Sequence, residues 1–188
     1  MFFNTLVSCL IIQRLGEVVV ARSNEKWMRK RGAVEYGERH YPFIVLLHVL
    51  FFLALFFEVI ITERQLVPLW QLVLAGFLIV QVLRIWALVS LGRFWNTKIL
   101  VLPYASIQTT GPYRFMKHPN YVVVALEFIL IPVLFQAYFT MVVFSLLNAL
   151  LLLLVRIPTE EKALSTVTND ADVNKNTPKF YPKVIKKV

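Results

Sequence analysis

Cysteine, glycine and aspartate are scarce in this chain, and each scarcity excludes a class of chemistry. The one cysteine, Cys9, cannot form an intrachain disulfide or a paired-cysteine zinc site. The six glycines form neither a GxGxxG pattern nor a phosphate-binding loop. The aspartates, Asp170 and Asp172, lie near the C-terminus, away from the three histidines, and no HExxH pattern occurs. We therefore expect no metal site and no Ser-His-Asp triad.

Charge is also scarce, whereas long hydrophobic runs are abundant. Only 16% of the 188 residues are charged and 58% are hydrophobic, which is typical of an integral membrane protein. The net charge of +9 does not indicate nucleic-acid binding, because the basic residues flank apolar runs instead of forming a stripe on a soluble domain. The N-terminus lacks the basic start and cleavage pattern of a signal peptide, so we expect its apolar run to be retained.

Three apolar runs are each long enough to cross about 30 Å of hydrocarbon. A further run, 121–156, would be about 54 Å long as one helix, so it must turn back on itself. Pro132 and the polar Gln136 mark the turn of a helical hairpin. The sequence thus predicts an all-α integral membrane protein with five transmembrane helices: 2–21, 42–61, 68–91, 121–135 and 138–155.

The basic residues between these spans predict the orientation. Lys and Arg number six in 22–41, one in 62–67, four in 92–120 and seven from residue 156 onward. This alternation follows the positive-inside rule, with the N-terminus outside and the C-terminus in the cytosol. We expect a single domain, 1–188, with its polar motifs in a core at 91–164 and a loosely ordered tail at 165–188.

Four ionisable residues lie within the predicted spans at one shared depth. Arg14, His48, Arg84 and Glu127 are each seven residues from a cytosolic span end, which places them about 10 Å deep. They either hold the helices together or line a polar cavity, and the shared depth favours a cavity. We expect Glu17 to pair with Arg14 one turn away, and Glu127 to pair with Arg84 or Arg14. Glu58, near the outer end of its span, is expected to reach water.

Two polar motifs flank the predicted hairpin. The first, GPYRFMKHPNY at 111–121, leads into the fourth span, and the second, RIPTEEKAL at 156–164, follows the fifth. The hairpin brings them together on the cytosolic face. Each also has a structural interpretation: Asn120 as a helix cap, and Pro158 with Glu160 and Glu161 as the first turn of a new helix.

The two motifs together resemble the isoprenylcysteine carboxyl methyltransferase family, which consists of small membrane enzymes that use S-adenosylmethionine. The family pattern is roughly GPYRxxRHPxY, an apolar hairpin and RxxxEExxL, and the match covers about 91–164. Lys117 stands where arginine is usual, which keeps the charge and loses the bidentate fork. The short chain resembles a bacterial branch that includes alkylpyrone O-methyltransferases.

The resemblance implies a role for each motif residue. His118 and Tyr121 would contact the amino-acid end of S-adenosylmethionine, in a cofactor site to which cytosolic loops and the C-terminal segment contribute. Arg156 and Glu160 are the catalytic candidates, with Arg156 holding an acidic acceptor. The other cofactor-site candidates are Tyr113, Asn120, Glu161, Trp95 and again Glu160. Asn96, Arg14, His48, Arg84 and Glu127 are the candidates for the substrate cavity.

The sequence therefore predicts an S-adenosylmethionine-dependent enzyme that O-methylates a lipophilic acceptor reaching it from the bilayer. The acceptor would present a carboxylate or an enolic or phenolic hydroxyl, as in an alkylpyrone or an isoprenoid-linked group. Three alternatives stay open: an NADPH-dependent sterol-type reductase, which also carries an HPNY-like motif before a hairpin, a phospholipid N-methyltransferase, and a non-catalytic transporter or scaffold.

Overall fold

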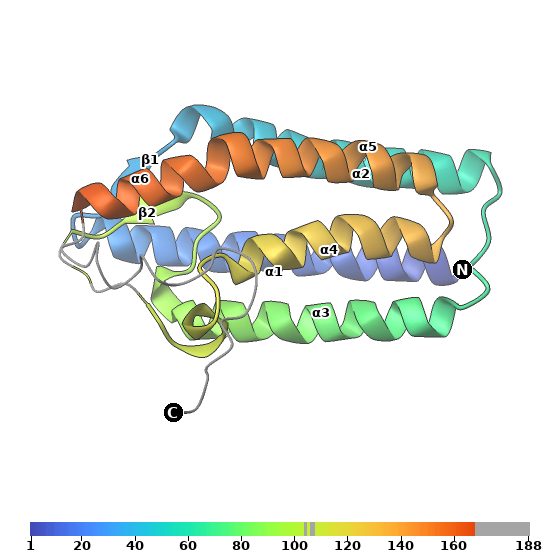
Figure 1. Cartoon of the computed structure of the whole chain (residues 1–188), viewed down its shortest axis with the longest axis horizontal. Helices are drawn as coiled ribbons and strands as arrows, with labels where there is room; N and C mark the ends of the chain where they lie inside the picture. Colours follow the sequence, from blue (N-terminus) through green and yellow to red (C-terminus); the bar gives the residue numbers. More distant parts are fainter. Residues whose placement is uncertain (104, 106–107, 168–188) are drawn as a thin grey trace, which may run out of the picture.

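Five long helices lie roughly side by side and form the body of the protein (Figure 1). The computed structural model describes residues 1–103, 105 and 108–167. The predicted tail therefore lies outside the described residues except for its first three, which are helical. The helices are α1 (Phe2–Arg29), α2 (Tyr41–Ile61), α3 (Trp70–Leu91), α4 (Pro119–Leu134) and α5 (Tyr138–Leu151).

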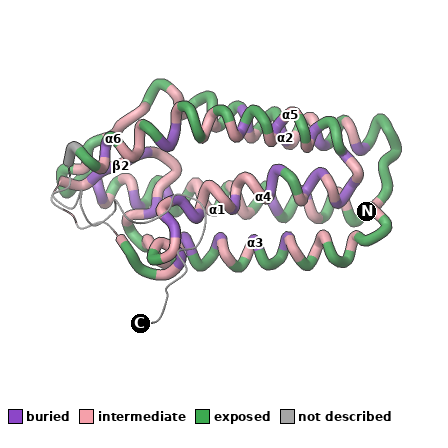
Figure 2. The backbone as a smooth tube through the Cα atoms, in the orientation of Figure 1, coloured by how far each residue is buried: buried purple, intermediate pink, exposed green. Residues whose placement is uncertain are grey.

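The helix lengths and their outer surfaces identify a multi-pass integral membrane protein. Helices α1, α2 and α3 and the continuous helical segment Tyr138–Ser165 are long and apolar enough to cross a membrane. Helix α4 is apolar but shorter, 16 residues or about 24 Å, so a fifth span stays a prediction. Exposed positions recur along all of these helices (Figure 2). Large apolar residues are among the exposed ones, including Ile12, Ile79, Val89 and Leu154.

The predicted hairpin is present between α4 and α5. Pro132 lies in the last turn of α4, and the turn itself passes through Gln136, whose φ is 55°. The Gln136 side chain also donates to the Leu66 carbonyl, which ties the hairpin to the loop between α2 and α3. Glu58 does more than reach water, contrary to our expectation. Its carboxylate accepts hydrogen bonds from the Thr140 amide at 2.8 Å and so caps the start of α5.

A packed aromatic core holds α2 against the hairpin. Phe51 of α2 stacks on Phe128 of α4 with ring centroids 4.3 Å apart, and contacts Phe144 of α5 edge-on. All three rings are buried. These contacts join three helices and so fix α2 against the hairpin that separates the two polar motifs.

A small two-stranded sheet covers the motif end of the bundle, and the sequence did not predict it. Strand β1 (Val34–Tyr36) pairs antiparallel with β2 (Ile99–Val101). Helix α6 (Ile157–Val167), the helix predicted after Pro158, packs Ala163 and Leu164 against β2. Three-residue strands are too short to show an alternating pattern, so local sequence offered no signal.

Helix α1 also runs eight residues beyond the predicted end of its span, through the polar segment RSNEKWMR. Lys98, beside β2, pairs with Glu25 of this extension at 3.0 Å and with Glu35 of β1 at 3.4 Å. The extension therefore connects α1 to the sheet.

Candidate functional site

The first motif folds into a turn followed by the start of α4. Its GPYR segment is the short 3-10 helix η3 (Gly111–Arg114), and Gly111 has φ of 57° with the Ser90 side chain where a Cβ would lie. A larger residue is excluded there by both strain and space. His118 precedes Pro119, the first residue of α4, and its own backbone is not helical, as expected before proline. The His118 side chain is buried.

The second motif begins in a widened turn. Between α5 and α6 the chain forms one π-helical turn, η4 (Leu152–Arg156), in which the Ile157 amide donates to the Leu152 carbonyl five residues back. Pro158 follows at once and has no amide hydrogen to donate. The wide turn accommodates the proline without ending the helix, and it directs Arg156 into the protein, where its side chain is buried.

The two motifs meet side chain to side chain. Tyr121 Oη donates to the Glu160 carboxylate and accepts from Arg156 Nε at 3.1 Å. His118 Nε2 lies 3.3 Å from Glu161 Oε1, and its ring stacks on that of Tyr121. These residues, 35 to 43 positions apart in sequence, form one connected group. Together with Tyr113 and Asn120 of the first motif, we call this group the motif site; it comprises Tyr113, His118, Asn120, Tyr121, Arg156, Glu160 and Glu161.

The loop after α3 forms one wall of the motif site. Arg156 Nη2 donates to the Thr97 carbonyl at 2.9 Å, and Thr97 Oγ1 lies 3.1 Å from Tyr41 Oη. Trp95 is buried in this loop, which follows the 3-10 helix η2 (Gly92–Phe94). Asn96 binds the Ala21 carbonyl and the Lys98 amide through its side chain, so it positions the loop against α1.

Buried polar atoms without partners concentrate in this region. Among the described residues, the buried side-chain atoms that lack a hydrogen-bond partner are Trp95 Nε1, Asn120 Oδ1, Arg156 Nη1 and His40 Nε2. The structural role we considered for Asn120 is therefore wrong: its amide caps no helix, and α4 begins without a side-chain cap. Buried groups of this kind are costly unless a ligand or water completes their hydrogen bonds.

Tyr113 is held neutral at the same site. Burial, with the nearby Glu160 carboxylate, raises the pKa of its phenol well above the usual range. Tyr113 therefore stays a hydrogen-bond donor at any physiological pH.

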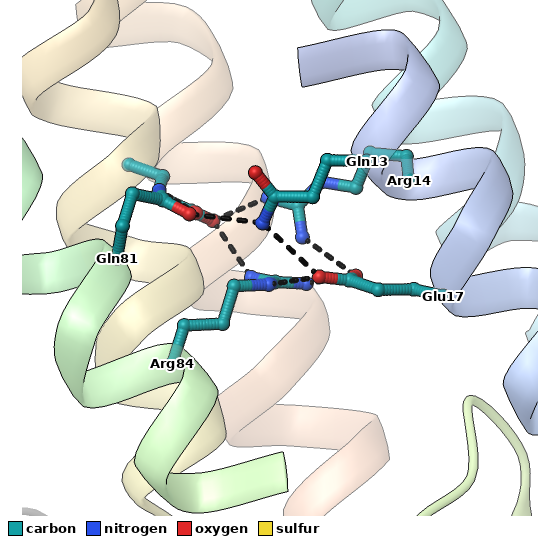
Figure 3. Close-up of polar contacts among 6 residues, drawn as sticks. Gln13, Arg14, Glu17, Gln81 and Arg84 are labelled. Atoms are coloured by element: carbon teal, nitrogen blue, oxygen red, sulfur yellow. Dashed lines mark hydrogen bonds and ion pairs between the residues drawn. The ribbon is translucent and has the colours of Figure 1, made fainter. Parts of the chain in front are cut away.

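Further inside the bundle the predicted ion pairs are present. The pairing of Arg14 with Glu17 is confirmed at 3.1 Å, and Glu127 pairs with both Arg14, at 2.5 Å, and Arg84, at 3.0 Å. Arg84 also binds Glu17 at 2.5 Å. Figure 3 shows the side chains of α1 and α3 converging on this point. We call these four residues the inner charge cluster.

Two glutamines that we did not predict complete the cluster. Gln81 Nε2 donates to Glu127 Oε1 at 2.7 Å, and Gln13 Nε2 donates to Glu17 Oε1 and Gln81 Oε1 (Figure 3). Each of the four carboxylate oxygens therefore accepts at least one hydrogen bond. Two arginines and two glutamates also cancel in charge, which is how a charged cluster is tolerated at this depth.

One cavity of about 840 Å³ connects the two regions. The motif site, Trp95 and Asn96 line one part, and Arg14, Glu17, Arg84, His48 and Asn148 line the part inside the bundle. Of the candidates named from sequence, Glu127 is the one that does not line it. Apolar residues of α1 and α2, such as Leu15 and Val49, line the cavity and are 61% and 50% exposed. The cavity is therefore open between α1 and α2.

Residues that the sequence did not single out also line the cavity. They include Tyr41, Thr97, Lys98 and Asn148. Tyr41 and Thr97 belong to no recognisable motif. They meet because α2 contacts a loop that is 56 positions away in sequence. Asn148 carried a signal that we passed over, because an amide within an apolar span is itself unusual.

Comparison with known proteins agrees with this arrangement. Residues 71–166 match the isoprenylcysteine carboxyl methyltransferase (ICMT) family. The chain is 53% identical over 162 residues to the uncharacterized protein YpbQ of Bacillus subtilis, covering 86% of this chain and 96% of that protein. A protein of Haemophilus influenzae is 28% identical over 166 residues, covering 88% and 96%.

The fold and the comparisons thus define the class of this protein: it is a multi-pass helical membrane protein in which two motifs line one cavity. The chain belongs to the isoprenylcysteine carboxyl methyltransferase family, which indicates a membrane methyltransferase. The resemblance inferred from the two motifs is confirmed.

Proposed function

We propose that this protein transfers the methyl group of S-adenosylmethionine to an oxygen of a lipophilic acceptor. The observation that carries the proposal is the continuous cavity, which joins a polar end with unpartnered buried atoms to an apolar part that opens between α1 and α2. A water-soluble, zwitterionic cofactor and a lipophilic acceptor need such a two-ended site.

The residues of the motif site fit the cofactor. The carboxylate of the cofactor would accept a hydrogen bond from Arg156 Nη1, which has no partner among the described residues. The ammonium and hydroxyl groups of the cofactor would donate to Asn120 Oδ1 and to the carboxylates of Glu160 and Glu161. Trp95 Nε1, the other unpartnered atom of the cavity wall, is a donor suited to the nucleoside. Bound there, the cofactor supplies an activated methyl group on a sulfonium.

The protein's own contribution is to align the acceptor with that methyl group and to exclude water. His118 and Tyr121 stack at the junction of the two motifs, and Tyr121 holds Arg156 and Glu160 in fixed positions. Alignment of this kind accounts for most of the acceleration available to a transfer between two bound reactants. Glu160, hydrogen-bonded to Tyr121, is also placed to bind the cofactor or to accept a proton.

We further propose that α4 is a fifth span despite its length. It lies between the motif site and the hairpin turn and packs along α3 and α5, so a few flanking residues at each end complete the crossing. The positive-inside pattern then puts the N-terminus outside and the motif site in the cytosol of a bacterial cell, where S-adenosylmethionine is made.

The decisive experiment follows labelled methyl from S-adenosylmethionine into solvent-extractable lipid. Membranes with the wild type should incorporate label, and His118→Ala and Glu160→Gln should not. Glu38→Gln, an exposed residue outside the cavity at the same end of the molecule, is the matched control and should keep wild-type activity. Mass spectrometry of the extract names the acceptor and shows whether oxygen or nitrogen carries the methyl group.

A binding measurement separates the methyltransferase from a reductase. Saturation with S-adenosylhomocysteine, at about 100 times its dissociation constant, should stabilise the protein by about 2.7 kcal/mol. NADP should have no effect. Stabilisation by NADP with none by S-adenosylhomocysteine would overturn the proposal.

A further inference from the structure

The inner part of the cavity contains a histidine that the alignment of cofactor and acceptor does not use. His48 lies in α2, two helical turns inside the membrane from Tyr41, and lines the cavity. Along the cavity face of α2, its neighbours Ile44, Val45, Val49 and Phe52 are all apolar. A polar ring among these residues is unusual, which makes His48 a candidate for a function.

The hydrogen bond of His48 determines which nitrogen carries the proton. Nδ1 lies 2.8 Å from the Ile44 carbonyl oxygen, which can only accept, so Nδ1 is the protonated nitrogen and Nε2 of the neutral ring has a lone pair. No described residue donates to Nε2. The ring is also held edge-on against Phe128, 5.2 Å between centroids, so it cannot turn to satisfy Nε2 elsewhere without losing this contact.

Arg14 provides hydrogen-bond donors at the same depth. Two consecutive residues of α4 contact these two side chains: Phe128 packs against the His48 ring, and Glu127 pairs with Arg14. A guanidinium has five N–H groups, and Arg14 uses one on Glu17 and one on Glu127. The inner cavity therefore offers an acceptor at His48 and donors at Arg14. A hydroxyl group, which both donates and accepts, matches this pair, whereas an ionised carboxylate offers nothing to Nε2.

We propose that His48 is a catalytic residue that binds the hydroxyl of an enolic or phenolic lipid and removes its proton. This inference rests on the proposed methyl transfer; it adds a catalytic residue and selects a hydroxyl over a carboxylate as the acceptor group. The acceptor oxygen forms a bond to the methyl carbon while the methyl–sulfur bond breaks and its electron pair returns to sulfur. The hydroxyl proton moves to Nε2, which leaves a methyl ether and a protonated His48. Because side chains of a helix lean toward its N-terminus, the ring reaches from α2 toward the motif site.

The first test measures binding without any turnover. Wild-type protein in nanodiscs should bind para-dodecylphenol about fivefold to tenfold more tightly than the methyl ether of the same compound, which has no proton to donate. His48→Phe, which keeps an aromatic ring against Phe128, should lose this preference. Among the three histidines, the Nε2 signal of His48 in nitrogen-15 NMR should move with the phenol and not with the ether. Equal affinities, or an unmoved signal, would overturn the inference.

The second test separates this inference from the methyltransferase proposal. His48→Gln keeps a hydrogen-bond acceptor and cannot take a proton, so methylation of the phenol should fall about a hundredfold with S-adenosylhomocysteine binding unchanged. Full activity of His48→Gln would remove His48 from the reaction and leave the methyltransferase intact. Phenol binding to His48 in a wild type that transfers no methyl would instead overturn the proposed reaction and keep the hydroxyl site.

Discussion

The inner charge cluster and the motif site both lie largely inside the protein and both contain arginine and glutamate, yet they differ in how their hydrogen bonds are completed. In the cluster every carboxylate oxygen has a partner, and the charges of Arg14, Glu17, Arg84 and Glu127 cancel. In the motif site Arg156 and Asn120 keep buried atoms without a described partner. The difference indicates that the first region stabilises the bundle, whereas the second has the unpartnered donors and acceptors that our proposed cofactor would complete.

The largest effect should come from breaking the cluster. Glu127→Gln removes the carboxylate that holds both Arg14 and Arg84, and leaves positive charge uncompensated inside the membrane. We expect a loss of about 3–5 kcal/mol in the free energy of unfolding, because removing one partner of a buried network costs more than an exposed pair. Chemical unfolding in detergent micelles measures this. Glu63→Gln, in an exposed loop, should change it by less than about 0.5 kcal/mol. Equal stabilities in the two variants would show that the cluster is not structural.

A smaller loss of stability, with loss of ligand binding, should follow Arg156→Lys. Lysine keeps the charge, but its donors all lie on one nitrogen, so it cannot reproduce the separate directions in which Arg156 reaches Tyr121, Thr97 and a ligand. We expect about 2 kcal/mol less stability. The more telling result is that S-adenosylhomocysteine should no longer protect the variant from thermal unfolding. Protection equal to that of the wild type would place the ligand elsewhere.

The comparison is sharpest with one matched pair of substitutions to leucine. Gln81→Leu removes a donor to Glu127 and an acceptor for Gln13, so it should cost about 1–2 kcal/mol of stability. Asn120→Leu removes an atom that already lacks a partner, so stability without ligand should stay within about 0.5 kcal/mol or rise. Its affinity for S-adenosylhomocysteine should fall about tenfold, which calorimetry measures. If Asn120→Leu destabilised the protein as much as Gln81→Leu, the two regions would not differ as we describe.

The smallest effect concerns Lys98, which ties β2 to α1 and β1. Although burial alone lowers the pKa of Lys98, its hydrogen bond and charge interactions with Glu25 and Glu35 outweigh this and raise the pKa above the usual value. A raised lysine pKa stabilises the folded state below the unfolded pKa, and this contribution is lost as the pH rises through the folded value. Unfolding followed from about pH 8 to about pH 11 should therefore show a smaller decline for Lys98→Met than for the wild type. High salt should shrink the difference, which for these partly exposed pairs is about 0.5 kcal/mol.

Much of this architecture could be predicted from local sequence. Long apolar runs predict helices wherever they occur, and Pro132 with Gln136 predicted the hairpin turn close to where it lies. Ionisable residues inside a span must find partners, so the pairing of Glu127 with Arg84 and Arg14 was predictable from depth alone. The polar extension of α1 and the pair of short strands were missed, since neither has a pattern that distinguishes it from a loop.

By itself, the sequence determined the helices, the hairpin and the two motifs, because these depend on hydrophobicity and on residues near one another in the chain. Only the tertiary structure decided which polar atoms are satisfied. An asparagine amide or an arginine guanidinium has the same donors and acceptors in every protein. Whether those of Asn120 and Arg156 find partners depends on packing among α2, α4, α5 and the loop that carries Thr97. Burial makes that difference costly, since a polar atom that loses water must gain a partner or a ligand.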